Sequence, residues 1–567
     1  MKKLLLTNEA IARGAYEAGA RVLSAYPGTP STEIAEKASK YDELYCEWAP
    51  NEKVALEVAI GASFAGGRAC ACMKHVGLNV AADPLFTAAY TGVNAGLVIV
   101  VADDPGMHSS QNEQDSRFYA RSAHIPMLEP SDSEEAKEFV RAAFEMSEKY
   151  DTPVLLRTTT RIAHSQSFVE LGERTEVPVK PYKKDITKYT MMPSSAKLRH
   201  VVVEKREAEL KADCERSDLN KIIINGTALG VVCSGAVYQY VREVLPDASV
   251  FKLGLVYPLP IESIREFSKK VDELLVIEEL EPFFENQLKA NGIECHGKDV
   301  FSLQGEITAA TIRERYCGIV ADAPKNVPVR PPVMCAGCPH RGVFYVLNKL
   351  KCTVTGDIGC YTLGAQPPLS AVDTVVCMGA SIGISHGFKK VLGEAAGKVV
   401  AVIGDSTFVH SGITGLINAV YNDSALTLVI LDNSTTGMTG HQNHPGTGKT
   451  LRGDDTVKLD LEAMVRACGV GKVDVTDAYD IAEFERLLKE DMALPYATCI
   501  IARRPCELLK KGEKPTLKID GCKGCQACLK LGCPALVLDN GFVRIDDGLC
   551  VGCGLCAKLC RFNAIKA

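Results

Sequence analysis

The sequence predicts an α/β protein with three parallel-sheet domains and a small, cysteine-rich α+β module at its C-terminal end. Two observations support this prediction. Short apolar strands alternate with helical stretches through most of the 567 residues, which is the pattern of parallel sheets covered by helices. The last 50 residues then hold eight cysteines in two closely spaced runs.

Residues 1–175 are the first expected domain. Their apolar periodicity predicts helices over 9–18 and 52–65. It also predicts strands over 21–25 and 97–102, the second of which is fully apolar. A strand that is apolar on both faces is typical of the buried centre of a parallel sheet.

A charged segment, 176–222, separates the first domain from the second. It is poor in apolar periodicity, so we expect a linker or excursion, in which one exposed helix is allowed. Residues 223–323 return to the α/β pattern, with short strands over 229–233, 250–253 and 273–277.

The third expected domain, 324–510, opens with a proline-rich connector over 324–332. Its clearest strands are 399–403 and 426–431, and both run into polar loops. The cysteine-rich module is expected over 511–567, after a lysine-rich stretch.

Composition limits the function classes. A net charge of −6 argues against a nucleic-acid-binding role. The 23 cysteines are scattered through apolar strands or grouped in metal-type motifs, so we expect a reducing, anaerobic cytoplasm rather than a disulfide scaffold. No apolar run is long enough for a signal sequence or a membrane span.

The terminal cysteines have the spacing of a two-cluster bacterial ferredoxin. In such modules the fourth cysteine of each run binds the other run's cluster. We therefore predict two 4Fe-4S clusters, one held by Cys522, Cys525, Cys528 and Cys560 and the other by Cys533, Cys550, Cys553 and Cys556. The pattern departs from the usual one by an extra residue before Cys533 and by Arg561 in place of a proline. Structural zinc sites are the alternative.

Polar residues follow both strands of the third domain. Strand 399–403 runs into Gly404, Asp405 and Ser406, and strand 426–431 into Asp432 and Asn433. Gly404 would let the backbone approach a phosphate, and hard oxygens such as these suit Mg²⁺. The pattern resembles, in degenerate form, the thiamine-diphosphate motif; an acidic surface turn is the alternative.

That resemblance implies a binding loop for the diphosphate. Asp405, Asn433 and the carbonyl oxygen of Thr435 are then the expected Mg²⁺ ligands. Ser406 is also expected to contact the cofactor. So are Gly437, Met438 and Thr439, which follow Thr435 in the second loop.

The segment NEKVALEVAIGAS resembles a helix of 2-oxoacid:ferredoxin oxidoreductases, and Glu52 falls on their catalytic glutamate. That glutamate contacts the aminopyrimidine of thiamine. The alternatives are Glu57, or a purely structural first-turn Glu52. The segment AYPGTPS resembles the same superfamily's substrate turn, with Thr29 at the position that contacts substrate, although a capped Pro-Gly turn would look similar.

Taken together, the motifs cover nearly the whole chain and resemble the indolepyruvate:ferredoxin oxidoreductase alpha-subunit family. They include ADDPGMHSSQNEQDSR, CAGCPHRG, GDIGCYTLGAQPP and LDNSTTGMTGHQNHPGTG. The resemblance implies thiamine-binding folds for the first and third domains and a transketolase C-terminal-like fold for the second.

The resemblance also implies an activity: oxidative decarboxylation of arylpyruvates to aryl-acetyl-CoA, with ferredoxin as electron acceptor. It implies a smaller beta subunit as partner, coenzyme A as co-substrate, and a dimer of this chain within a larger complex. The rival hypotheses are a non-oxidative thiamine-dependent decarboxylase and a pure electron-transfer subunit.

One position departs from the pyruvate-type relatives, which carry a substrate-binding arginine after the strand that matches 97–102. Here the sequence reads Asp103-Asp104-Pro105, and carboxylates would repel a keto acid. We expect Lys74 or His75 to bind the substrate carboxylate instead, although either could be structural.

Two further groups are candidates for chemistry. His441 and His444 follow the diphosphate loop and could donate protons, or could only order the loop. Cys335, Cys338 and Cys360 resemble the beta-chain pattern that holds a cluster beside the thiamine in related enzymes, and Cys506 lies about where those relatives have the fourth ligand. That resemblance implies a third cluster on these four cysteines. The alternative is a turn with an ordinary pair of buried thiols.

Overall fold

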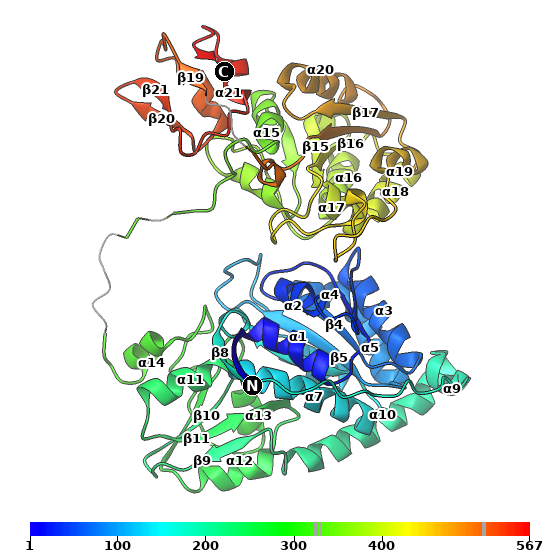
Figure 1. Ribbon diagram of the computed structural model, residues 1–567, viewed down its shortest axis with the longest axis vertical. Helices are drawn as coiled ribbons and strands as arrows, with labels where there is room; N and C mark the ends of the chain where they lie inside the picture. The colour runs from blue at the N-terminus through cyan, green and yellow to red at the C-terminus, as the bar shows by residue number, and fades with distance from the viewer. Residues whose placement is uncertain (321–326, 329, 513–516, 567) are drawn as a thin grey trace. The chain divides into compact units, whose positions relative to one another are not determined.

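The computed structural model describes residues 1–320, 327–328, 330–512 and 517–566. The chain divides into two compact units, Met1–Lys325 and Asn326–Ala567 (Figure 1). The expected connector 324–332 and the start of the tail module lie partly outside the described residues. The expected division into five segments stays a prediction within these two units.

The first unit is built on a seven-stranded sheet with the order β12-β6-β7-β5-β4-β2-β3. All its strands run parallel except the edge strand β12. In sheet order the strands are Leu255–Tyr257, Met127–Leu128, Val154–Thr159, Leu97–Asp103, Ala69–Lys74, Val22–Ala25 and Tyr45–Trp48.

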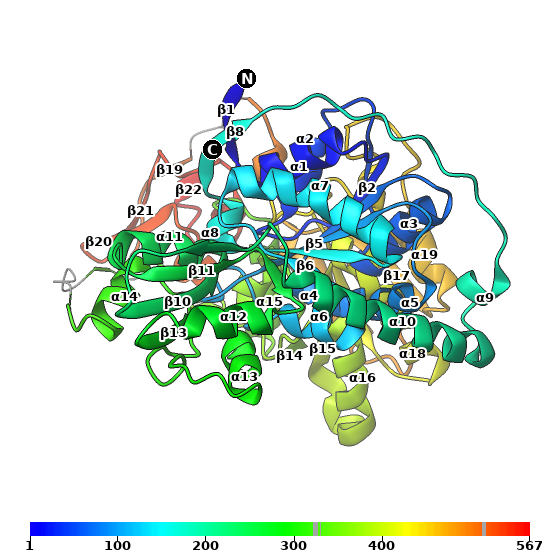
Figure 2. The same ribbon diagram turned by 90° about the horizontal axis from the view of Figure 1, so that it is seen from below.

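Helices cover both faces of this sheet. Helices α1 (Thr7–Glu17) and α7 (Ser133–Tyr150) lie on one side of β5, and α5 (Ala82–Thr91) and α10 (Pro193–Cys214) on the other (Figure 2). Every residue of β5 is buried, as expected for a central strand covered on both faces.

Two segments differ from the expectation. Strand β12, from the expected second domain, pairs antiparallel with β6 and so completes the first sheet. The expected linker holds the 22-residue helix α10, which buries Val203, Arg206 and Leu210 among other side chains. Its buried face mixes arginines with apolar residues, so apolar periodicity alone did not predict it.

A second sheet in this unit has the order β13-β10-β11-β9. Its strands are Glu273–Ile277, Leu229–Ser234, Ser249–Leu253 and Lys221–Ile223. The first three run parallel and confirm the predicted strands, and β9 is antiparallel.

The second unit contains a five-stranded parallel sheet with the order β14-β15-β16-β18-β17. In sheet order the strands are Thr353–Thr355, Val399–Gly404, Thr427–Asp432, Thr498–Arg503 and Lys472–Asp477. Every residue of β15 and β16 is buried, so both strands lie at the centre and point their C-terminal loops to one edge. The three predicted parallel-sheet α/β regions are therefore confirmed.

The cysteine-rich module is α+β, as predicted. Strand β19 (Lys518–Ile519) pairs antiparallel with β22 (Ile565–Lys566), and β20 (Leu536–Asp539) with β21 (Phe542–Ile545). Because β19 precedes the first cysteine run and β22 follows the second, their pairing brings the end of the second run close to the start of the first. The module packs on α15 (His340–Lys349) through a shared apolar core.

Candidate active site and cluster sites

In the first unit, candidate residues follow the C-terminal ends of three neighbouring strands. Thr29 follows β2, Glu52 follows β3, and Lys74 ends β4. Parallel strands bring their C-terminal ends to one edge of the sheet, where α/β folds bind ligands. The side chain of Ser109 reaches the same edge and donates a hydrogen bond to the carbonyl oxygen of Thr29 (3.3 Å).

Glu52 is the first residue of helix α3 (Glu52–Phe64) and is only 4% exposed. Asn51 caps this helix by accepting a hydrogen bond from the N–H of Val54 (2.9 Å). Glu57, the alternative candidate, lies on the exposed face of the helix and pairs with Lys53. Of the two carboxylates, only Glu52 is buried at the strand ends.

Gly77 of helix α4 (His75–Val80) packs directly against the Glu52 side chain. A Cβ atom at Gly77 would lie 2.6 Å from both Cγ and Oε1 of Glu52. Such distances are shorter than van der Waals contact, so a glycine is needed here for Glu52 to keep its position.

Lys74 is buried, and its ammonium donates to the carbonyl oxygen of Ser109 (2.9 Å). Burial lowers the pKa of Lys74 to about 8, although the charges of Asp104 and Glu52 act in the opposite direction. His75 is also buried, which lowers its pKa, and its ring nitrogens form no hydrogen bond of good geometry although Asn112 is within reach. Both candidates for binding the substrate carboxylate therefore reach this edge.

The two aspartates at the C-terminal end of β5 already have hydrogen-bond donors within the fold. Arg157 donates to Asp103 (2.7 Å), which is fully buried. Asp104 accepts hydrogen bonds from Ser110 (2.7 Å) and Thr160 (2.6 Å). Arg157 compensates the charge of Asp103, and the Asp104 carboxylate is stabilised by these hydroxyls and by the charge of Lys74. The two aspartates are therefore not the bare repulsive pair that the sequence suggested.

In the second unit, three oxygen-bearing groups meet at the ends of β15 and β16. One terminal atom of the Asn433 amide lies 3.2 Å from Asp405 Oδ1 and 2.8 Å from the carbonyl oxygen of Thr435. If that atom is nitrogen, it donates two hydrogen bonds. If it is oxygen, three oxygens converge. The two separations given are then close to the distance between neighbouring ligand oxygens around an octahedral Mg²⁺ ion, about 3 Å. The N–H of Thr435 also points to this atom at 3.3 Å, a contact that an oxygen would accept.

His444 orders this loop. Its Nδ1 accepts the N–H of Gly446 (3.2 Å), so a neutral ring carries its proton on Nε2, which lies 3.3 Å from Asp405 Oδ2. Burial raises the pKa of Asp405, and His444 opposes that shift. His441 has a left-handed backbone conformation, with φ of 69°, and its buried Nδ1 has no hydrogen-bond partner among the described residues.

The loop's other predicted residues lie beside these oxygens. Ser406 accepts a hydrogen bond from Thr436 (2.9 Å), and Thr439 donates to Gln442 (2.6 Å). Met438 is 52% exposed. A Cβ atom on Gly404 would lie 2.5 Å from the ring of Tyr361, so the missing side chain accommodates this tyrosine, and contact of Gly404 with a phosphate stays a prediction.

Four more cysteines gather next to that loop. A Cβ atom at Gly437 would lie 3.4 Å from the sulfur of Cys360, and the N–H of Cys506 donates to the carbonyl oxygen of Asn433 (2.9 Å). The thiols of Cys335, Cys338, Cys360 and Cys506 are close enough to act on one another's pKa. Backbone N–H groups point to the sulfurs of Cys338 and Cys506, as at iron–sulfur sites.

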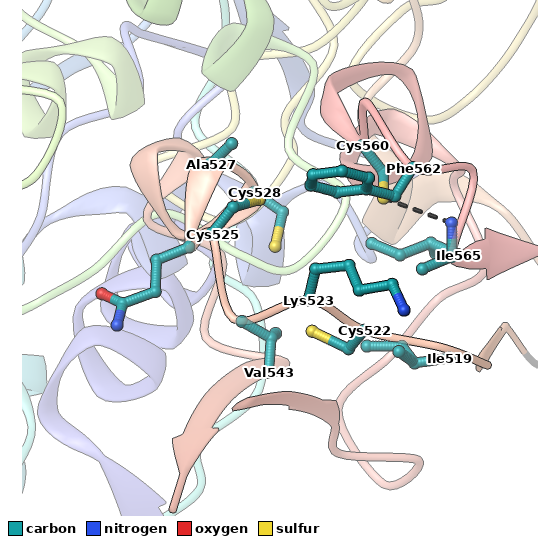
Figure 3. Close-up of a pocket in the computed structure, with 12 residues that line it drawn as sticks. Ile519, Cys522, Lys523, Cys525, Ala527, Cys528, Val543, Cys560, Phe562 and Ile565 are labelled. Carbon is teal, nitrogen blue, oxygen red and sulfur yellow. Dashed lines mark hydrogen bonds between the residues drawn. The ribbon is translucent and has the colours of Figure 1, made fainter. Parts of the chain in front are cut away.

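The tail cysteines line two cavities in the crossed arrangement. One cavity is lined by Cys522, Cys525, Cys528 and Cys560 (Figure 3). Figure 3 also shows the hydrogen bond from the N–H of Ala564 to the sulfur of Cys560 (3.3 Å). A second cavity is lined by Cys533, Cys550, Cys553 and Cys556.

Two buried residues of the second unit were not predicted from sequence. Asp357 accepts hydrogen bonds from the N–H groups of Gly379 (2.8 Å) and Ser381 (3.0 Å) and so holds the start of helix α16 (Ala380–Leu392) against the loop that carries Cys360. Arg341 donates hydrogen bonds to the carbonyl oxygens of Cys335 and of Gly532, the residue before Cys533. Both belong to quoted motifs, but nothing in a single sequence marks a charged residue as buried.

Comparison with known proteins agrees with these sites. Residues 13–215 match the family described as pyruvate flavodoxin/ferredoxin oxidoreductase, thiamine diP-binding. Residues 357–502 match the thiamine pyrophosphate enzyme C-terminal TPP-binding domain, and residues 543–566 the 4Fe-4S binding domain.

Full-length relatives decide the family. The indolepyruvate oxidoreductase subunit IorA of Archaeoglobus fulgidus is 42% identical, over 100% of this chain and 97% of the relative. The proteins of the same name from Methanothermobacter thermautotrophicus and Pyrococcus horikoshii are 41% and 39% identical, with the same coverage. This chain belongs to the IorA family.

IorA family membership makes the chain a subunit of a thiamine-dependent oxidoreductase with iron–sulfur clusters. The glutamate edge of the first unit falls within the region matched to the oxidoreductase family, and the Asp405 loop within the TPP-binding match. None of the helices that the structure describes has the length and apolar character needed to span a membrane.

Proposed function

We propose that this chain catalyses the oxidative decarboxylation of arylpyruvates (indolepyruvate, phenylpyruvate and hydroxyphenylpyruvate) to aryl-acetyl-CoA and CO₂. Electrons would pass through iron–sulfur clusters to ferredoxin. The observation that carries the proposal is the position of Cys360 and Cys506, which touch the loop that offers Asp405 and Asn433. A non-oxidative decarboxylase would not need a redox site there. The name of the IorA relatives supports an indolepyruvate substrate.

The residues fit the cofactors that the family implies. Thiamine diphosphate, when bound, supplies the electron sink that a 2-oxo acid needs to lose CO₂. We assign its Mg²⁺ to Asp405, Asn433 and the carbonyl oxygen of Thr435. One Asn433 amide atom lies 3.2 Å from Asp405 Oδ1 and 2.8 Å from the carbonyl oxygen of Thr435, separations that suit neighbouring Mg²⁺ ligands when that atom is the amide oxygen. His444 would orient Asp405 through its Nε2–H.

The first unit would supply the acid–base groups. The buried Glu52 carboxyl would exchange a proton with the aminopyrimidine N1′ of the cofactor. Lys74 would bind the substrate carboxylate, and Thr29 would contact the substrate from the same edge. His75 and His441 are the remaining candidates for proton transfer, since each has a buried ring nitrogen without a well-aligned partner among the described residues.

We assign three clusters to the chain: two in the tail cavities and a third on Cys335, Cys338, Cys360 and Cys506. The remaining parts of the proposal are the partners. They are a smaller beta subunit, coenzyme A, ferredoxin and a second copy of this chain, in the cytoplasm.

The test replaces Glu52 by glutamine. Because the amide cannot exchange the N1′ proton, we expect turnover to fall by about 10²–10⁴-fold with the iron content unchanged. Glu57→Gln, on the exposed face of the same helix, is the matched control and should keep full activity. Full activity in Glu52→Gln would remove Glu52 from the mechanism. CO₂ release by the wild type without ferredoxin reduction would instead favour the non-oxidative decarboxylase.

A further inference from the structure

Arg341 lies between two of the cysteine sites. It is the second residue of α15, three positions after Cys338, and is 2% exposed. Its Nε donates to the carbonyl oxygen of Cys335 (3.0 Å), and its Nη2 donates to that of Met334. Its Nη1 donates to the carbonyl oxygens of Leu531 (2.9 Å) and Gly532 (2.6 Å), directly before Cys533. One guanidinium thus joins the loop of the third cluster site to the loop of the second tail cluster site.

The charge of Arg341 has no carboxylate partner among the described residues, since its four hydrogen bonds all go to carbonyl oxygens. Two of the other buried arginines differ: Arg117 pairs with Asp115 and Glu278, and Arg157 pairs with Asp103 and Glu129. Arg206 also donates only to carbonyl oxygens, but the carboxylate charges of Asp151 and Glu207 act on it. Burying an unpaired charge is strongly unfavourable, so a compensating negative charge is expected near Arg341.

The compensating charge can come from the thiolates. The four groups with the strongest favourable electrostatic effect on Arg341 are Cys533, Cys338, Cys335 and Cys553. Two belong to the third cluster site and two to the second tail site. A cubane bound by four thiolates is anionic, and each added electron makes it more so. Arginine stays protonated at any physiological pH, so its charge is fixed while the clusters change theirs.

We propose that Arg341 is a positioning residue for electron transfer: its fixed charge raises the reduction potentials of both adjoining clusters, and its hydrogen bonds hold their two loops together. The part of this inference that concerns the third cluster rests on the proposed function, where that cluster is assigned. In the step that it assists, the third cluster loses one electron and the second tail cluster gains it, and no bond or proton has to move. The other tail site contains Cys522. None of its cysteines is among the four groups with the strongest favourable electrostatic effect on Arg341.

The experiment is an anaerobic redox titration of the full chain, followed by electron paramagnetic resonance. It compares wild type with Arg341→Gln and Arg341→Lys, after iron and sulfide have been counted in each. For Arg341→Gln we expect the reduction equilibria of the two adjoining clusters to shift at least tenfold toward the oxidised state, which is about 59 mV for a one-electron couple. The cluster around Cys522 serves as the internal control and should shift much less. Arg341→Lys keeps the charge and should stay close to wild type.

Three results would overturn the proposal. The first is an Arg341→Gln protein with all its iron and unchanged potentials. The second is an Arg341→Lys protein whose potentials fall as far as those of the glutamine variant, since charge would then not be the cause. The third is loss of iron from both variants, which would assign Arg341 to folding alone. A wild type with only two clusters would refute the third-cluster assignment, while the effect on the second tail cluster would still be measured.

Discussion

At the scale of single residues, Lys74 is a buried cation among the candidate site residues of the first unit. It shares the strand-end edge with Glu52, and burial lowers its pKa to about 8. A base with this pKa is cationic below pH 8 and loses its charge as the pH rises through that value. An ammonium that binds a carboxylate would therefore lose affinity for a 2-oxo acid within the range in which the enzyme can be assayed.

We expect KM for the 2-oxo acid to rise above pH 8. Lys74→Met should raise KM at pH 7 and remove this dependence. Lys53→Met, at an exposed residue of α3, is the control and should keep the wild-type profile. Initial rates between pH 6.5 and 9.5 measure both. A KM in the wild type that stays flat across pH 8 would exclude Lys74 as the carboxylate ligand.

The residue types at this edge could be read from the sequence, but their pairing could not. Asp103 and Asp104 looked like a repulsive pair because the sequence does not show that Arg157, from the neighbouring strand β7, reaches Asp103. Likewise, the CAGCPHRG segment predicted cysteine ligands but no role for Arg341. That role depends on the hydrogen bonds to Leu531 and Gly532, which are far away in the sequence.

At the scale of elements, helix α4 fixes the start of helix α3. Gly77 leaves the space that the Glu52 side chain fills. Gly77→Ala should therefore leave the fold intact, because alanine favours helices, and displace Glu52. Small displacements of catalytic groups cost up to about 10²-fold, so we expect kcat/KM to fall by about 10–100-fold.

Gly61→Ala is the matched control for this prediction. Gly61 lies within α3, and a Cβ atom there meets nothing within 4 Å, so activity should be unchanged and thermal stability equal or slightly higher. Steady-state kinetics and thermal unfolding on both variants separate the two effects. Equal activity in the Gly77 and Gly61 variants would show that this contact does not position Glu52.

Most elements that carry the site were predictable because their strands are short, apolar and followed by polar loops. This holds for β5, β15 and β16, whose observed bounds fall within about one residue of the predicted ones. Strand β12 was not predictable. Its three residues are buried and apolar, but only the tertiary fold decides that they pair with β6 rather than with a strand of the second sheet.

At the scale of the whole molecule, the chain separates its tasks. The first unit carries the buried glutamate and the candidate substrate-binding groups. The second unit carries the Mg²⁺-type oxygens and all three cysteine sites, arranged from the diphosphate loop to the tail. Cys360 touches that loop, Arg341 links the third site to the second tail site, and Cys560 belongs to the far cavity. This order is the path that electrons would follow to ferredoxin.

The central claim is that one chain combines thiamine chemistry with three clusters. Counting iron, sulfide and thiamine diphosphate per chain in anaerobically purified protein tests it most directly. We predict about twelve irons and one thiamine diphosphate in the wild type, and about eight irons with thiamine retained in Cys360→Ser. Eight irons in the wild type would confine the clusters to the tail, and iron without thiamine, even after adding cofactor and Mg²⁺, would contradict the proposed enzyme and favour an electron-transfer subunit.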